Sequence, residues 1–569
     1  MEIDDIALTR ARESRAAIER LYVEMRHLFN SGLYRNLGSR GEVLTEALLT
    51  LSPEIYGSMG DPNKVELDGL VYVMDRLPRG IESCRYIKLI SEEGYGDSGF
   101  EVITPYARRR NCYRVDDTYM FMEVTRGRSE IYDILTHLTF MYMEAEKIKS
   151  HVLDASGGVR MEWQKLENIV RGNVPLDDKS REVAFTYLST ILGRSFAETK
   201  RAYERLHEHP KTNNGLFQIV YGLGKLALDE TLMGLHREIT FSSTLRARIG
   251  HHIYGERWAC TIKARMLESG LLDRPLHIIS SNTHSVLNSL YAYPVLGKAL
   301  NTHHIESLVL EMTKPENGEL RNRVREYAHD NGMIQLDEDF STNITVQIID
   351  TAKLDLAGLS PELQADLAYL QQEKPVILVM DYAFGEQAYE TMDELLKPHR
   401  VGEQSYPMQV VSISIMGKAG ILTGGKGDIM VPTSHVFEGT ADNYPLVNEF
   451  VQTDFADAGV AVYEGPMITV LGTSLQNRDI LSYFKNSSWG AIGLEMEGAH
   501  YQKAIQAAAQ IRRSIRQNVI LRYAYYASDN PLETGSTLAS GSLGVIGIRP
   551  TYQITLKILN RILQPPRWK

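Results

Sequence analysis

Three carboxylates near the end of the chain have the types and spacing of groups that do chemistry. Glu495 and Glu497 lie two residues apart in the sequence Gly-Leu-Glu-Met-Glu-Gly-Ala at 493–499. Asp529 follows an apolar, aromatic run at 519–527 that predicts a buried strand. A carboxylate at the C-terminal end of a strand lies where open α/β sheets bind ligands. Taken alone, Glu-x-Glu is also typical of a helix N-terminus, and Ser-Asp-Asn-Pro of a turn.

The segments around these carboxylates alternate between strand and helix. Strands are predicted at 376–380, 409–415, 427–431, 467–471 and 519–526, and helices at 386–396, 445–456, 497–511 and 552–563. This alternation indicates a largely parallel, three-layer α/β/α domain, which we place at 371–569. The unbroken apolar run Val-Ile-Leu-Val-Met at 376–380 is typical of a strand covered on both faces. The predicted fold class is therefore α/β.

Two further regions precede this domain. Residues 266–370 are predicted as a small α/β domain, with strands at 276–279 and 345–349 and helices at 286–296 and 361–372. Its polar turn at 280–285 is typical of a helix N-cap, and a phosphate or effector site is the alternative. Residues 1–265 are predicted to be mostly helical, since apolar residues recur there at steps of three and four. We expect this region to serve oligomerisation, substrate gating or regulation.

Composition narrows the classes of function. The net charge of −11 over 569 residues disfavours nucleic acid or an anionic membrane as a partner. There is no 18-residue apolar run, and the acidic start lacks the features of a signal peptide, so we expect a cytoplasmic protein. The three cysteines lie far apart and form no metal or redox pair. The paired histidines at 251–252 and 303–304 lack a third ligand at familiar spacing, so we expect no metal and no cofactor.

Four short motifs occur in one order between residues 416 and 529. They are Met-Gly-Lys-Ala-Gly at 416–420, Gly-Asp-Ile-Met-Val at 427–431, Glu-Met-Glu-Gly-Ala at 495–499 and Ser-Asp at 528–529. Together they resemble the nucleoside phosphorylase and nucleosidase superfamily, over about residues 374–569. Within that superfamily, the chain resembles AMP nucleosidases in two further segments. Thr-Ser-Leu-Gln-Asn-Arg-Asp at 473–479 is similar to their Thr-Thr-Asp-Asp-Arg-Asn, and Ser-Asp-Asn-Pro-Leu at 528–532 to their Ser-Asp-Lys-Pro-Leu.

The resemblance implies an enzyme that cleaves a purine N-glycosidic bond. Asp529, oriented by Ser528, would be the general acid toward purine N7, with a pKa raised by apolar neighbours. Glu497 would accept hydrogen bonds from the ribose hydroxyls as positive charge develops on the sugar. The other implied substrate contacts are Glu495, Met496, Lys418, Gly417, Gln387, Thr473 and Arg478. The glycine-rich run at 535–547 follows the acid and is either a loop that closes over the site or a plain connector.

The nucleophile separates two enzyme classes. Phosphorylases of this superfamily bind phosphate with an Arg just before the glycine turn. This chain has Ile415 at that position, so the resemblance favours water as the nucleophile. Lys418 could replace that Arg, which would make the protein a phosphorylase with phosphate as a second substrate, or could bind a 5′-phosphate. We therefore expect a homo-oligomeric nucleosidase that acts on a purine ribonucleoside or ribonucleotide. A nucleotide sensor without turnover is the alternative from another class.

Overall fold

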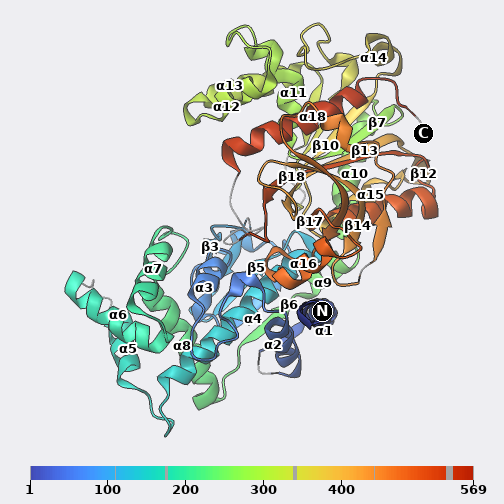
Figure 1. The fold of residues 1–569 in the computed structure, drawn as a ribbon. Helices are drawn as coiled ribbons and strands as arrows, with labels where there is room; N and C mark the ends of the chain where they lie inside the picture. Colours follow the sequence, from blue (N-terminus) through green and yellow to red (C-terminus); the bar gives the residue numbers. More distant parts are fainter. Residues whose placement is uncertain are drawn as a thin grey trace. The chain divides into compact units, whose positions relative to one another are not determined.

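The structure, a computed structural model, describes residues 2–36, 38–108, 110–172, 177–336, 342–440, 442–533 and 543–567. Most of the predicted loop at 535–547 lies outside these residues. The chain forms two compact units. One unit consists of Met1–His251 and Ser474–Ile480, and the other of His252–Thr473 and Leu481–Lys569. Figure 1 labels their helices and strands.

The first unit is mostly helical, as the sequence predicts. Its helices are α1 (Glu2–Ser31), α2 (Ser39–Leu51), α3 (Leu67–Met74), α4 (Gly127–Val152), α5 (Met161–Gly172), α6 (Asp178–Leu192), α7 (Phe196–His207), α8 (Leu216–Met233) and α9 (Ser243–Gly250). Helix α4 is buried along nearly its whole length. A helix enclosed on all sides needs no single apolar stripe, which explains the buried polar residues on α4.

This unit also contains a sheet that the sequence patterns do not predict. The described strands are β1 (Leu33–Arg35), β2 (Tyr86–Ile90), β3 (Glu101–Ile103), β4 (Cys112–Arg114), β5 (Tyr119–Glu123) and β6 (Glu238–Phe241), in the order β1-β6-β2-β5-β4-β3. None of these six strands exceeds five residues. Strands this short show too few repeats of the two-residue alternation to be recognised.

The second unit is built on one large sheet. Its strands are β7 (Pro275–Ser280), β8 (Met333–Leu336), β9 (Val346–Asp350), β10 (Val376–Met380), β13 (Gln409–Ile421), β14 (Ile429–Phe437), β15 (Asn443–Pro445), β16 (Val462–Thr469), β17 (Gly493–Glu495) and β18 (Ile520–Asp529). A separate hairpin joins β11 (His399–Val401) and β12 (Gln404–Tyr406). Strand β18 pairs both β13 and β14, and β17 pairs both β13 and β16. Because β14 also pairs β16, these five strands close a ring.

Helices cover this sheet on both faces (Figure 1). They are α10 (Ile253–Glu268), α11 (Thr283–Leu296), α12 (Ile305–Thr313), α13 (Gly318–Asp330), α14 (Leu367–Glu373), α15 (Gln387–Leu395), α16 (Arg478–Asn486), α17 (Gly498–Gln506) and α18 (Ile548–Ile562). One core packs α10, α15 and α17 on the sheet, and a second core packs α11–α14 and α18. The predicted three-layer α/β/α architecture is therefore confirmed.

The predicted small domain at 266–370 is not separate from the predicted domain at 371–569. Its strand β7 lies between β10 and β13 and pairs with both in parallel, and β9 pairs with β10. Residues 266–370 do form strands and helices as predicted, but they complete the same sheet. The sequence could not show this, because pairing between strands about 100 residues apart leaves no local pattern.

Two other expectations were wrong in detail. The sheet is mixed rather than largely parallel, since β8–β9 and β14–β15 pair antiparallel across short connections that cannot return the chain in parallel. The segment 445–456 contains a short turn at Gln452–Phe455 and no α-helix. Its Asn448 side chain donates to the carbonyls of Pro432 and Tyr523 and accepts from the Tyr523 amide. These bonds hold the chain against neighbouring strands and oppose helix formation.

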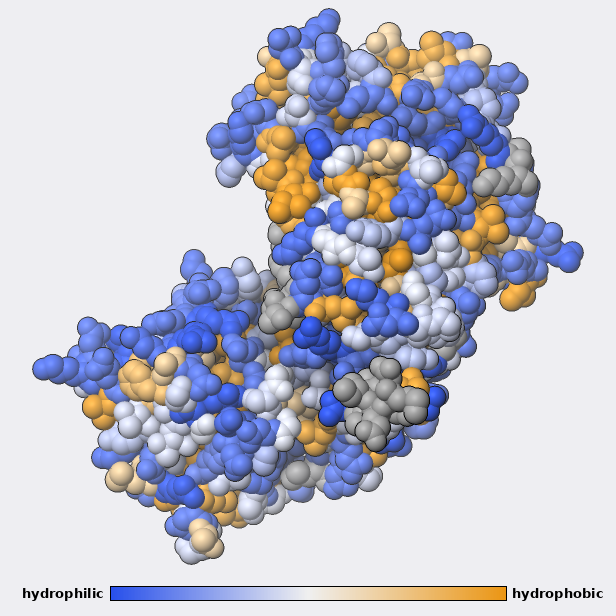
Figure 2. All heavy atoms as spheres, in the orientation of Figure 1, coloured by the Kyte–Doolittle hydropathy of each residue, from blue (hydrophilic) through white to orange (hydrophobic). Residues whose placement is uncertain are grey.

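On the face seen in Figure 2, hydrophilic residues predominate and hydrophobic ones form scattered patches. Across the described part of the chain, no helix is both long and apolar enough to cross a membrane. Likewise, no group of three or more His, Cys, Asp or Glu side chains is placed there to hold a metal ion.

Candidate functional site

Two of the three predicted carboxylates end strands that share one partner strand, and the third, Glu497, follows two residues after β17. Asp529 is the last residue of β18, and Glu495 is the last residue of β17. On β13, Gly420 is the register partner of both Asp529 and Leu494, the residue before Glu495. A bulge between Ala419 and Gly420 shifts the register just before this point. The bend in β13 thus brings the carboxyl ends of β17 and β18 to the same edge of the closed ring.

Glu495 organises the start of helix α17. Its carboxylate accepts hydrogen bonds from the backbone amides of Glu497 and Gly498 and from the Thr469 hydroxyl at 2.6 Å. Its side chain is buried, which raises its pKa, while these bonds act in the opposite direction. Glu495 therefore does what the purely structural interpretation of Glu-x-Glu predicts, because it satisfies amides at a helix N-terminus.

Glu497 is held differently. It is the N-cap residue of α17, yet its side chain makes no capping bond to that helix. Its carboxylate instead accepts from the Gly385 amide at 2.8 Å and from the Met496 amide at 3.1 Å. Burial and the neighbouring Glu495 charge raise the pKa of Glu497. Glu497 thus links the start of α17 to the turn after β10, and its geometry is not that of a simple helix cap.

Asp529 has no exposed surface. Its Oδ1 accepts a hydrogen bond from the Ser528 hydroxyl, and its Oδ2 is buried with no hydrogen-bond partner among the described residues. Burial raises the pKa of Asp529, while Ser528 and the positive charges of Lys418 and Lys426 oppose that shift. A buried carboxyl with one unpartnered oxygen is costly for the fold, which makes it a candidate for a functional group.

The β13 residues named by the sequence lie beside this site. A side chain at Gly417 would meet the ring of Tyr382, whose nearest atoms lie 2.6 Å from the position of its Cβ. Lys418 is exposed, and its charge acts on Asp529. Ile415, just before the Met-Gly-Lys-Ala-Gly segment, is fully buried in the apolar core.

Other predicted site residues have structural partners or lie elsewhere. The side-chain amide of Gln387 binds backbone groups. It donates to the Thr342 carbonyl at 2.7 Å and accepts from the Phe384 amide at 3.2 Å. Met496 is buried next to Glu497. Thr473 is the last residue of its segment in the second unit, whereas Arg478 belongs to the first unit with Ser474–Ile480. Arg478 is therefore not brought to the carboxylates within one unit.

Sequence reasoning missed three residues that position the site. Thr469, at the end of β16, binds Glu495 and also accepts from the Ala499 amide at 3.0 Å. Tyr501 on α17 binds the ends of two strands, through the Ser280 hydroxyl at 2.8 Å and the Ala383 amide at 3.1 Å. Tyr382 covers Gly417, and its hydroxyl lowers the pKa of Glu497. No pattern marked Thr469, because it lies in the middle of the strand predicted at 467–471, whereas β16 ends at this residue.

Comparisons with known proteins place the chain in a family. The sequence matches the family described as "Family of unknown function (DUF6909)" over residues 42–300 and 301–564. No curated protein matches the sequence.

Several solved structures resemble the chain at low identity. A 5′-methylthioadenosine/S-adenosyl homocysteine nucleosidase from Campylobacter jejuni is 10% identical, covers 51% of this chain and 98% of its own, and has a TM-score of 0.29. An AMP nucleosidase from Bacteroides thetaiotaomicron is 14% identical, with coverages of 48% and 90% and a TM-score of 0.25. Isoform 2 of uridine phosphorylase from Schistosoma mansoni is 11% identical, with coverages of 51% and 87% and a TM-score of 0.28. Since the family match spans most of its length, the chain belongs to the DUF6909 family.

Proposed function

We propose that the second unit hydrolyses the N-glycosidic bond of a purine ribonucleoside or ribonucleotide and releases the free base. Asp529 carries this proposal, because its Oδ2 is buried and unpartnered among the described residues and its pKa is raised by burial. A carboxyl whose pKa is raised by burial keeps its proton to a higher pH than an exposed one, and it can donate that proton to a bound base. The motif order described above, which resembles the nucleoside phosphorylase and nucleosidase superfamily, supports the choice of a purine.

Ser528 is suited to hold the protonated acid. Its hydroxyl lies 3.0 Å from the Ala419 carbonyl oxygen and also bonds Asp529 Oδ1. A hydroxyl has one hydrogen, so it donates to one of these oxygens at a time. When Ser528 donates to Oδ1 of Asp529, that oxygen is occupied as an acceptor and the proton of the acid is carried on the unpartnered Oδ2. Ser528 is therefore a positioning residue in this mechanism.

In the proposed reaction, Asp529 donates its proton to purine N7 as the bond between the base and ribose C1′ breaks. The bonding electron pair leaves with the base, and positive charge develops on the ribose ring. Glu497 accepts hydrogen bonds from the ribose hydroxyls, which strengthen as that charge grows. Water attacks C1′ and releases a proton to solvent, and Asp529 takes up a proton to regain its starting state, so the products are free base and ribose, or ribose 5-phosphate. Because Asp529 has no exposed surface, the site must open before a substrate can reach it.

Phosphorolysis is the second candidate, and Lys418 favours it. This side chain is exposed and its positive charge acts on Asp529, so phosphate bound there would lie near the site of bond cleavage. The same Asp529 and Glu497 roles would then yield ribose 1-phosphate. The remaining alternative is a nucleotide sensor, which would bind a nucleotide at this site without cleaving it.

The test is release of base from AMP, adenosine, inosine, methylthioadenosine and uridine, each with and without inorganic phosphate. We expect phosphate-independent release from one or more of the purine compounds. Asp529→Asn should lower the rate by about 10²-fold or more, because general acid catalysis is typically of that size. Asp457→Asn is the matched control, since Asp457 is an exposed carboxylate of the same unit that pairs with Lys557.

The outcomes separate the three functions. Release only in the presence of phosphate would establish phosphorolysis instead of hydrolysis. No release from any substrate by the folded protein, or full activity of Asp529→Asn, would contradict the proposal.

A further inference from the structure

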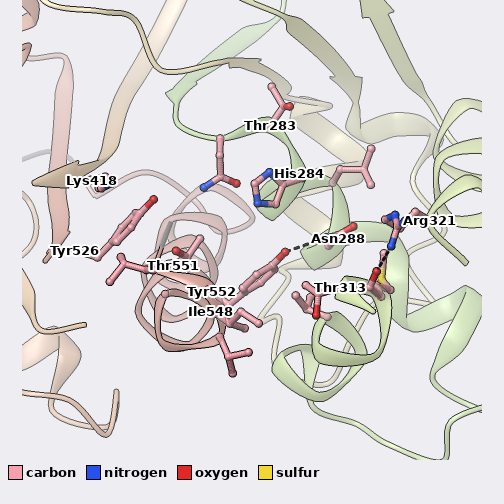
Figure 3. A pocket seen from close by; sticks show the side chains of 18 of the residues that line it. Thr283, His284, Asn288, Thr313, Arg321, Lys418, Tyr526, Ile548, Thr551 and Tyr552 are labelled. Atoms are coloured by element: carbon pink, nitrogen blue, oxygen red, sulfur yellow. Dashed lines mark hydrogen bonds between the residues drawn. The ribbon is translucent and has the colours of Figure 1, made fainter. Parts of the chain in front are cut away.

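A large cavity lies within the second unit beside Lys418. Its volume is about 950 Å³, and it is bordered by α11, α12, α13, β8, β9 and α18. Figure 3 shows Lys418 and Tyr526 at one side, Arg321 and Thr313 at the other, and Tyr552 of α18 between them. Tyr552 accepts a hydrogen bond from Asn288 at 2.9 Å, which ties α18 to α11 across the cavity floor. The volume suits a ligand of nucleotide size.

The lining is positively charged although the chain is acidic. Arg321, Arg325 and Lys418 line the cavity, and no Asp or Glu is among its described lining residues. The whole chain carries a net charge of −11, so this distribution is not an average property of its surface. A cavity whose described lining carries cations and no carboxylate attracts anions.

The two arginines differ in how firmly they are held. Arg321 donates to the backbone carbonyls of Met312 and Lys314, and so it also stabilises the end of α12. Arg325 has no ion-pair or hydrogen-bond partner among the residues that the structure describes. Since they lie four residues apart on α13, both guanidinium groups are on one side of that helix. Two guanidinium groups in this arrangement can bind the oxygens of one phosphate.

Two further features of the lining suit a polar, anionic ligand. The N-terminus of α11, a helix of 14 residues, contributes Asn282, Thr283 and His284 to the wall. The N-terminal amides of a helix attract phosphate. Independently, Gln347 on β9 lines the cavity with only 4% of its surface exposed, and its Oε1 has no hydrogen-bond partner among the described residues. Because buried polar atoms are normally hydrogen-bonded, this amide oxygen is suited to accept a hydrogen bond from a ligand.

The cavity is connected to the proposed reaction site through β13. Lys418 lines the cavity, and its charge also acts on Asp529. Its register partner on β18 is Tyr526, which lines the cavity too and lies three residues before Asp529. The three carboxylates themselves are not part of the lining. A ligand with its anionic group in the cavity would therefore lie next to the carboxylate site without filling it.

We propose that this cavity binds the phosphate group of the substrate, so that the proposed reaction acts on a phosphorylated nucleoside. Arg325 and Arg321 would bind the phosphate oxygens, the N-terminus of α11 would contribute amides, and Gln347 would accept from a ligand hydroxyl or amine. This inference rests on the proposed function for the identity of the nucleoside. The phosphate chemistry itself comes from the cavity.

The test is equilibrium binding, measured by calorimetry on full-length protein carrying Asp529→Asn so that nothing is turned over. The probes are AMP, adenosine, inorganic phosphate, and adenosine with saturating phosphate. We expect AMP to bind about tenfold or more tightly than adenosine, and Arg325→Gln to remove most of that advantage. Arg323→Gln is the matched control, because Arg323 is an exposed arginine on the same helix that does not line the cavity. Adenosine affinity should be unchanged in both variants.

Each outcome has one meaning. If AMP has no advantage but inorganic phosphate binds and depends on Arg325, the site takes free phosphate, and an attached phosphate is excluded. If AMP and adenosine bind equally without any phosphate binding, or if Arg325→Gln and Arg323→Gln have the same effect, the proposal is wrong. If neither AMP nor phosphate binds at millimolar concentration, the proposal is also wrong. Arg325-dependent binding of AMP without base release by the unmodified protein would overturn only the proposed hydrolysis.

Discussion

The two glutamates of the Glu-Met-Glu segment have different tasks although they are nearly adjacent. Glu495 accepts from two amides at the start of α17 and from the Thr469 hydroxyl. Glu497 makes no capping bond to α17, and its carboxylate accepts instead from the Gly385 amide in the turn after β10. Because both are buried in one place, each proton bound by the pair relieves repulsion between them. Glu495 is mainly a structural residue in this arrangement, and Glu497 is the one available to a ligand.

This division predicts different responses to amide substitution. Burial and the charge of Glu495 raise the pKa of Glu497 above its usual value of 4.5. The folded state therefore binds more protons than the unfolded state above pH 4.5, so the free energy of unfolding falls as pH rises from there through neutrality. Glu497→Gln removes one such group. We therefore expect the decrease in the free energy of unfolding with rising pH to be smaller in this variant by more than about 1.4 kcal/mol.

Glu495→Gln should behave otherwise. It leaves at least one buried donor without its acceptor, so we expect a loss of about 1–3 kcal/mol in the free energy of unfolding. Chemical denaturation from pH 4 to pH 9 would measure both effects, with Asp457→Asn as the surface control. A Glu497→Gln protein whose stability varies with pH as steeply as the unsubstituted protein would contradict the assignment.

At the scale of the element, strand β13 determines where the site lies. It pairs with β7 over 409–415 and with β18 over 412–420, and it reaches β17 only at Gly420 and Ile421. Gly417 lies just before that bend, and Tyr382, from the chain after β10, packs directly on it. The glycine in the Met-Gly-Lys-Ala-Gly segment is thus required by close packing of an aromatic ring, and the same ring is near Glu497.

Gly417→Ala should therefore act through Tyr382. The added methyl group would lie 2.6 Å from the ring, so the ring or the strand must move. We expect a loss of about 1–3 kcal/mol in the free energy of unfolding, the usual cost of overpacking. Tyr382→Ala should make the added methyl nearly neutral, which a double-mutant cycle in urea would measure.

Gly425→Ala is the control for that cycle, because nothing lies within 4 Å of the position of its Cβ. Equal losses in the presence and absence of the Tyr382 ring would show that the ring is not the cause.

At the scale of the whole molecule, a short segment that follows β16 and includes the first residues of α16 belongs to the first unit. Ser474–Ile480 is flanked on both sides by chain of the second unit. The Gln476 carbonyl accepts from the Glu54 amide at 3.0 Å, and the Asn477 side chain donates to the Leu51 carbonyl at 2.7 Å. Asn477 also accepts from the first amides of α16. The first unit is therefore completed by residues more than 400 positions away in the sequence.

Asn477→Ala should weaken this attachment selectively. We expect backbone amides at 51–57 to exchange hydrogen faster, by about tenfold if one net hydrogen bond is lost. Amides of β10 (Val376–Met380) should be unaffected. Hydrogen exchange followed by mass spectrometry would measure both regions in the full chain.

The control for this experiment is Asn560→Ala. Asn560 makes a comparable bond to the Glu362 carbonyl, within the second unit. It should speed exchange only near 362–364, and faster exchange at 51–57 in that variant would refute the local attachment.

Periodicity in the sequence was enough to locate many elements of the second unit. The apolar run at 376–380 is β10 to the residue, and the predicted final helix lies within α18. Those patterns are local, because burial on both faces demands apolar residues whatever the strand pairs with. The order of four short motifs and the resemblance that they carry likewise named Asp529, Glu495 and Glu497 as a candidate site.

Tertiary structure decided what joins these elements. The closed ring, the inclusion of β7 in the main sheet and the bond between Gly385 and Glu497 all connect segments far apart in the chain. The cavity arginines on α13 carry no local signal, since charged residues on an exposed helix usually face solvent. A sequence records which face of an element is apolar, but which faces meet depends on pairing and packing over the whole domain. The candidate carboxylates could therefore be named from the sequence, whereas the separate partners of Glu495 and Glu497 and the cationic cavity required the fold.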